Sequence, residues 1–167
     1  MDDQAAWEQA VAAARSSYAT LSPATAAELD GLIEKIVQLK QKLVETVTAA
    51  GSSEICRNCG GECCRFGKFH VTVLDILAYL KNGVQVVIPD FSSNPACPYS
   101  NASGCSMSAG YRPMTCVVFN CQQVEEQLSS ALQELLYICE QELRESITKG
   151  CHITGQRLDR ALLLSGN

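Results

Sequence analysis

The sequence predicts a mainly α-helical fold, in which an N-terminal helical hairpin and a long C-terminal helix surround an irregular, cysteine-rich middle. Apolar residues recur at spacings of three and four on both sides of that middle, as on the buried face of a helix. The middle is rich in Cys, Gly, Ser, Asn and Pro, and most of these are typical of turns and loops. The length of 167 residues, 47% of them apolar, suits a single domain with a hydrophobic core. This domain divides into a helical hairpin over 1–50, a cysteine-cluster, metal-binding region over 51–121 and C-terminal helices over 122–167.

The hairpin consists of two predicted helices, over 3–19 and 25–49. Pro23 between them ends the first helix and lets the second begin. Thr25, with Glu28 three residues later, predicts a capping box at the start of the second helix. The apolar residues of this helix form a seam that is expected to pack on another helix: Leu29, Leu32, Ile36, Leu39, Leu43 and Val47.

Short elements are predicted within the middle. A helix over 71–82 begins at Thr72 and ends at Gly83. The β-branched run after it predicts a brief strand or extended segment ending at Pro89. From 91 to 121 the sequence predicts a long loop, which needs something other than a hydrophobic core to hold it.

The C-terminal segment predicts one long helix over 122–149, ended by Gly150 and followed by a short closing helix from Asp159. Cys139 lies on the apolar stripe of the long helix, so we assign it to the core and not to a metal. The full stripe consists of Val124, Leu128, Leu132, Leu135, Cys139, Leu143 and Ile147.

Composition excludes several classes of protein. The net charge is −5 and the 13 Lys and Arg residues are scattered, so we expect no nucleic-acid partner. No apolar run approaches the ~20 residues of a membrane span, so we expect no membrane partner. The chain starts with acidic residues and no secretory signal, which predicts a cytoplasmic protein. In that reducing compartment, clustered cysteines favour metal binding or catalysis over disulfides.

Eight of the ten cysteines fall into two dense clusters, which we call the upstream and downstream clusters. Several thiolates converging on one point are what a soft metal needs, so we predict that the metal is zinc or iron, the latter including an iron–sulfur cluster. Gly60 and Gly61 permit the tight loop that a chelating Cys-x2-Cys pair requires. The predicted ligands are Cys56, Cys59, Cys63 and Cys64 upstream, and Cys97, Cys105, Cys116 and Cys121 downstream.

The sequence leaves open how these cysteines share metals. Cys63 and Cys64 are adjacent, so their side chains point apart unless the turn is sharp, and both bind most simply if they serve different metals. Two four-cysteine sites, one four-cysteine site with spare thiols, and a binuclear centre with bridging sulfur all satisfy the pattern. His70, Cys151 and His152 are further candidates that we leave outside the ligand set.

Two charged residues of the middle have roles that the sequence suggests. Arg112, ahead of Pro113, either compensates the negative charge of a thiolate cluster or forms an ion pair with Asp75 or Asp90. Asp75 is most simply a favourable charge near the positive end of the helix over 71–82.

The ordered set of cysteine motifs resembles a known family. Cys56-x2-Cys59-x3-Cys63-Cys64 is followed by Cys97-Pro98, Gly104-Cys105 and Arg112-Pro113-x2-Cys116-x4-Cys121. This order, over 55–122, is similar to the CxxCxxxCC cysteine-cluster family of zinc- or iron-chelating domains. The resemblance implies a metal or iron–sulfur centre held by the eight cysteines. Larger members resemble flagellin lysine N-methylases, which favours iron. Family members commonly have an arginine after the RPxxC cysteine and a proline before the last cysteine, where this chain has Val117 and Asn120.

Three functions follow from these observations. The leading hypothesis is a metal-thiolate protein with an accessory, metal-handling or redox role. The first alternative is an iron–sulfur-dependent enzyme or enzyme component related to protein lysine N-methylases. We favour a non-enzymatic role, because the chain has neither a Gly-rich nucleotide loop nor a second domain for a methyl donor. The second alternative is a structural zinc module that binds a protein partner, or a second copy of itself, through its apolar helix seams.

Overall fold

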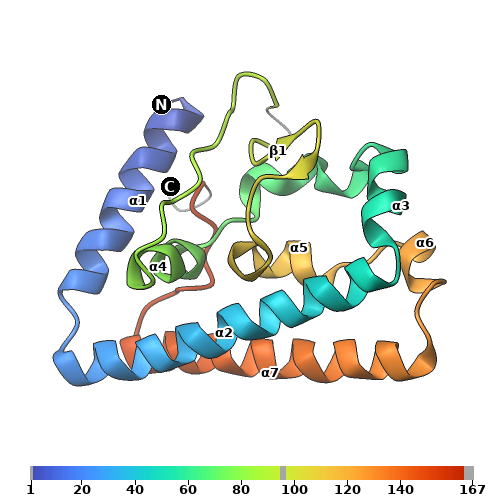
Figure 1. The fold of residues 1–167 in the computed structure, drawn as a ribbon. Coiled ribbons are helices and arrows are strands. Elements are labelled where there is room, and N and C mark those ends of the chain that lie inside the picture. The colour runs from blue at the N-terminus through green and yellow to red at the C-terminus, as the bar shows by residue number, and fades with distance from the viewer. Residues whose placement is uncertain (1, 95–96, 164–167) are drawn as a thin grey trace.

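The computed structural model describes residues 2–94 and 97–163 and is mainly helical, as the sequence predicts (Figure 1). Two long helices, α2 (Pro23–Ala49) and α7 (Ser130–Thr154), lie along one another and form one side of the molecule. The first helix, α1 (Asp3–Ala19), rises from the start of α2 and packs on α4 (Val73–Lys81). The N-terminal helical region and the long C-terminal helix are therefore confirmed, although α1 and α2 diverge from the turn that joins them.

The middle of the chain consists of short elements. The upstream cysteine cluster lies on α3 (Ser52–Cys59) and on the 3-10 helix η1 (Glu62–Phe69). For residues 84–90, after α4, the sequence predicts either a brief strand or an extended segment. They form an extended segment and join no strand of the described chain. The segment over 91–121 was expected to be one long loop, but it contains several elements. They are the antiparallel strands β1 (Ser100–Asn101) and β2 (Gly104–Cys105), the 3-10 helix η2 (Ala109–Tyr111) and the helix α5 (Met114–Val118).

Two predicted helix ends are wrong, each for an identifiable reason. The capping box on Thr25 and Glu28 does not form, because α2 begins at Pro23 and its cap is Ser22, whose Oγ accepts from the Thr25 backbone N–H at 3.1 Å. Gly150 does not end the C-terminal helix. It is buried inside α7, where a Cβ would already be in ordinary contact with Leu158 and Leu29.

The C-terminal segment also differs from the prediction of one helix over 122–149. A short helix, α6 (Gln122–Glu125), comes first, and Ser129 then caps α7 by accepting from the Leu132 backbone N–H at 3.3 Å. α7 ends at Gly155, which has the positive φ of 65° typical of a helix C-terminus. The predicted closing helix does not form over the described part of the tail, where Ala161 makes a single bridge to Thr72, and residues 164–167 lie outside the described chain.

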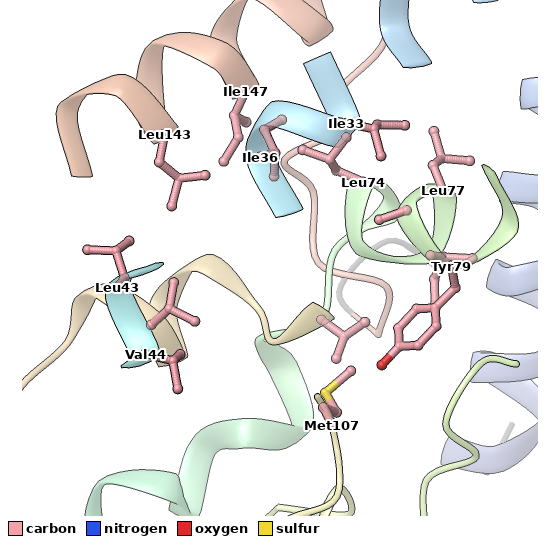
Figure 2. Packing of buried hydrophobic residues seen from close by; sticks show 14 of the residues in the cluster. Ile33, Ile36, Leu43, Val44, Leu74, Leu77, Tyr79, Met107, Leu143 and Ile147 are labelled. Atoms are coloured by element: carbon pink, nitrogen blue, oxygen red, sulfur yellow. The ribbon is translucent and has the colours of Figure 1, made fainter. Parts of the chain in front are cut away.

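The hydrophobic core lies between α2, α4 and α7 (Figure 2). The seams of α2 and α7 face each other, and Leu29, Leu43 and Leu143 are at most 1% exposed. Cys139 is 3% exposed on the same face of α7, so its predicted core position is confirmed. Because each seam is covered by the other, the proposal that they bind a partner or a second copy of the chain loses its support.

A buried ion pair joins α2 to α4. The Lys40 Nζ donates to Asp75 Oδ1 at 2.5 Å, and both side chains are 2% exposed. The other carboxylate oxygen of Asp75 accepts from the backbone N–H and hydroxyl of Thr72, which forms the capping box of α4. Thr72 is therefore the helix cap that the sequence predicts, but Asp75 is a buried, paired charge and not only a charge near the helix end.

Candidate metal centre

The upstream cysteines lie on two short helices joined by a tight reversal. Cys56 and Cys59 occupy α3, and the Cys59 Sγ lies 3.4 Å from the Cys56 carbonyl oxygen. Gly60 and Gly61 follow with φ of 66° and 73°, which confirms the predicted left-handed glycines. They turn the chain so that Cys63 and Cys64 fall in the first part of η1.

The segments that carry the downstream cysteines lie on the same side of the molecule as these helices (Figure 1). Cys97 packs on the η1 backbone at Gly67, where a Cβ would lie only 2.5 Å from the Cys97 Sγ. The Cys116 Sγ on α5 lies 3.3 Å from Nδ1 of His70, the residue that ends η1. Helix α6, whose N-cap is Cys121, contacts α3. The two clusters, distant in sequence, therefore meet on one side of the molecule.

Three other cysteines act electrostatically on Cys56 of α3. The pKa of the Cys56 thiol is raised first by burial and then by the negative charges of the Cys63, Cys59 and Cys121 thiolates. The positive charge of Arg112 acts in the opposite direction. We call this set, Cys56, Cys59, Cys63 and Cys121, the helix group.

The remaining four cysteines, of which Cys105 lies in β2, act electrostatically on one another. Burial, followed by the charges of the Cys63, Cys97 and Cys105 thiolates, raises the pKa of Cys64 to about 12. Burial also raises the pKa of Cys116, followed by the charges of Cys105, Cys97 and Cys64. We call this set, Cys64, Cys97, Cys105 and Cys116, the hairpin group.

Each group combines cysteines of both sequence clusters. The helix group has three upstream cysteines and Cys121, and the hairpin group has Cys64 and three downstream cysteines. The adjacent Cys63 and Cys64 fall into different groups, although the charge of Cys63 also raises the pKa of Cys64 and Cys97. This is the arrangement in which two neighbouring cysteines can each bind a different metal.

The chemistry of this donor set fits a soft metal. All ten cysteines are free, and burial and mutual repulsion favour the neutral thiol at Cys56, Cys64 and Cys116. Over residues 2–94 and 97–163, no three His, Cys, Asp or Glu side chains are arranged as a metal-binding group, and the Cys59 sulfur faces a backbone carbonyl. Neutral thiols have no electrostatic reason to converge. A cation that displaced their protons would supply one, because thiolates repel each other and are attracted to the metal.

Arg112 lies beside the helix group. Its Nε donates to the Met107 carbonyl at 3.1 Å, and its charge lowers the pKa of Cys56. The two carboxylates considered as ion-pair partners of Arg112 have other contacts. Asp75 pairs with Lys40, and Asp90 accepts hydrogen bonds from Ser92 and Ser93. Compensation of thiolate charge by Arg112 stays a prediction, supported by the opposition of its charge to the rise in the Cys56 pKa.

A buried tyrosine lies beneath the hairpin group, and the sequence analysis did not single it out. Tyr79 is 2% exposed and stacks on Tyr111 with ring centroids 4.6 Å apart. Its hydroxyl is buried, has no hydrogen-bond partner in the described chain and points toward Met107 (Figure 2). Burial raises its pKa, as do the charges of Asp75 and Cys105. An unused donor within range of the Cys105 charge fits a centre that becomes negatively charged when its thiols ionise.

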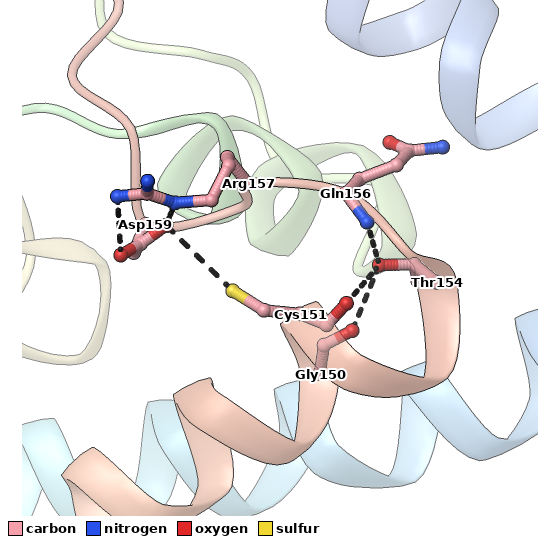
Figure 3. A network of polar contacts seen from close by, with 6 residues as sticks. All are labelled: Gly150, Cys151, Thr154, Gln156, Arg157 and Asp159. Carbon is pink, nitrogen blue, oxygen red and sulfur yellow. Dashed lines mark hydrogen bonds and ion pairs between the residues drawn. The ribbon is translucent and has the colours of Figure 1, made fainter.

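The remaining candidates lie at the far end of α7. Cys151 Sγ is 3.8 Å from Asp159 Oδ1, which also accepts from Arg157 Nε at 2.8 Å (Figure 3). His152 is exposed on the last turn of the same helix. Cys121, by contrast, comes just before the start of α7, so the helix separates Cys151 and His152 from both cysteine groups.

No family model, curated protein or solved structure matches the chain. The resemblance to the CxxCxxxCC family therefore remains a prediction from the spacing of the cysteines. Over the described ranges, no helix is both long and apolar enough to cross a bilayer.

Proposed function

We propose that this chain is a metal-thiolate protein with two metal centres, one formed by the helix group and one by the hairpin group. What supports this proposal is that the two sequence clusters meet: Cys97 packs on Gly67 of η1, the Cys116 Sγ lies 3.3 Å from Nδ1 of His70, and α6 contacts α3. Four thiolates complete a tetrahedral zinc site and also suffice for an iron–sulfur cluster. Zinc or iron is the metal, and the eight predicted cysteines are its ligands.

Bound metal would stabilise the segment of α3 and η1, which has little hydrophobic core of its own. α3 and η1 bury only Ser52 and Gly67, and Ile55 of α3 packs against the core while partly buried, so apolar burial contributes little to holding this segment in place. Binding of a metal to sites formed only in the folded chain adds its binding free energy to folding. Each centre would join the upstream segment to the downstream segment, and together they would order the middle of the protein.

An accessory, metal-handling or redox role in the cytoplasm fits these groups better than catalysis. Two surface hollows of about 570 and 500 Å³ are lined by residues that include Glu45 and Leu132, and Arg144 and His152, respectively, and neither is lined by a cysteine. A nucleophilic cysteine needs a lowered pKa, whereas the pKa is raised at Cys56, Cys64, Cys97 and Cys116.

The experiment is metal analysis and absorption spectroscopy of protein purified anaerobically under reducing conditions. We expect two centres per chain. Zinc would leave the protein colourless, and an iron–sulfur cluster would give visible absorption that bleaches on reduction. Cys59→Ser and Cys116→Ser should each lose one centre and keep the other, because they alter different groups.

Cys139→Ser is the matched control. It should keep both centres and lose about 1–3 kcal/mol of stability, because it places a hydroxyl in the apolar core. Equal metal content in all three variants would contradict the proposal, as would wild-type protein that binds no zinc or iron.

A further inference from the structure

His70 contacts the hairpin group from a fixed position. It is the C-cap of η1, and its backbone N–H donates to the Gly67 carbonyl at 3.1 Å. Cys97 packs on the same glycine. The imidazole is partly buried, and its Nδ1 lies 3.3 Å from the Cys116 Sγ. His70 therefore contacts the Cys116 sulfur with its ring and is held through its backbone by Gly67, the residue on which Cys97 packs.

Once a metal is bound, the chemistry of the contact between His70 and Cys116 determines which of the two donates the hydrogen bond. A metal-bound thiolate has no proton and can only accept a hydrogen bond. The imidazole nitrogen facing it must then donate its N–H, and such a bond to a charged acceptor is stronger than one between neutral groups.

The number of ligands argues against direct metal binding by His70. Structural zinc sites are almost always four-coordinate, and the hairpin group already supplies four sulfurs. A fifth donor would have to displace a cysteine. The contact that His70 makes in the structure is with a sulfur, at a distance suited to an N–H···S hydrogen bond.

We propose that His70 is a positioning residue of the hairpin group, whose Nδ1–H donates to the metal-bound sulfur of Cys116 while the four cysteines alone bind the metal. This inference rests on the proposed function and adds a residue to it. The hydrogen bond orients the Cys116 sulfur and draws charge from it. Loss of the bond therefore weakens metal binding at this group and makes Cys116 more reactive toward alkylation.

The experiment compares His70→Phe with His70→Asn in protein reconstituted with Zn²⁺. Phenylalanine removes the donor, while the asparagine amide N–H takes a place close to that of Nδ1–H. Chelator competition measures zinc affinity, and peptide mass spectrometry measures the rate at which iodoacetamide modifies Cys116. In His70→Phe we expect about 10–100-fold weaker binding of one of the two zinc ions and faster alkylation of Cys116. His70→Asn should stay close to wild type in both.

His152→Phe is the control for the loss of a histidine, because His152 is exposed at the far end of α7. It should change neither measurement. Equal weakening in His70→Asn and His70→Phe would make His70 a ligand and overturn the inference, as would wild-type behaviour of both. Wild-type protein that binds two zinc ions with no effect at His70 refutes the inference alone. Wild-type protein that binds no zinc refutes the proposed function and the inference together.

Discussion

The α2–α7 pair and the cysteine-rich middle are held together in different ways. α2 buries six apolar residues and one lysine, whereas α3 buries only Ser52 and η1 only Gly67. The helix pair is therefore stabilised by apolar burial, which depends on the spacing of side chains along each helix. α3 and η1 bury little apolar surface of their own, so we expect the order of this part of the middle to depend on what its sulfurs bind.

These two regions meet at a few specific contacts. Lys40 of α2 reaches Asp75 at the start of α4, and Gly110 of η2 lies so close to α2 that a Cβ would be 2.7 Å from Val37. If the two regions are stabilised in these different ways, substitutions at the contacts between them should destabilise the whole protein. Substitutions inside the middle should instead affect metal binding first.

Lys40→Met has the largest expected effect on stability. It leaves Asp75 buried without its partner, and loss of one member of a buried ion pair costs about 3–5 kcal/mol. Urea denaturation of zinc-saturated protein measures this loss. Lys35→Met is the control, because Lys35 pairs with Glu142 at the surface, where both side chains are about half exposed. That change should cost roughly 0–1 kcal/mol. Similar losses in the two variants would mean that the buried pair does not join the regions.

Gly67→Ala should affect the middle without affecting the helix pair. A Cβ at this position would lie 2.5 Å from the Cys97 sulfur and 3.1 Å from its Cβ, so Cys97 must move. We expect zinc binding by the hairpin group to weaken about 10–100-fold, as for other contacts that orient a ligand. The helix group should keep its zinc ion. Competition with a chelator separates the two sites.

Gly31→Ala is the matched control and the smallest change. Gly31 is exposed within α2, and a Cβ there would meet nothing within 4 Å. Alanine should therefore stabilise the helix by about 1 kcal/mol and leave both zinc ions bound. The comparison fails if Gly67→Ala retains both sites at full affinity, or if Gly31→Ala alters metal binding.

The helix pair could be predicted from the sequence because apolar periodicity is a local property. Lys40 carried a readable signal that was missed, since it lies four residues after Ile36 and three before Leu43 on the buried seam. A lysine at such a position needs a buried partner. The cap at Ser22 was also readable, because proline favours the first position of a helix.

The site could be predicted only in part. Clustering identified eight cysteines, but the division into two groups depends on which segments meet in space. Gly67 shows why, since its role is set by Cys97, which lies far along the chain. The contact of His70 with Cys116 is another pairing that no local spacing indicates. Tyr79 also belongs here, because its unused hydroxyl becomes apparent only once the core is assembled.

Hydrogen exchange of the backbone amides, compared with and without bound metal, measures the difference between the two regions directly. We expect removal of the metal by a chelator under reducing conditions to increase exchange strongly over 52–69 and 97–118. Amides of α2 and α7 at Ile33 to Val44 and Leu136 to Ile147 should remain protected. Equal protection of the middle in metal-free protein would show that bound metal does not order it and would contradict the account.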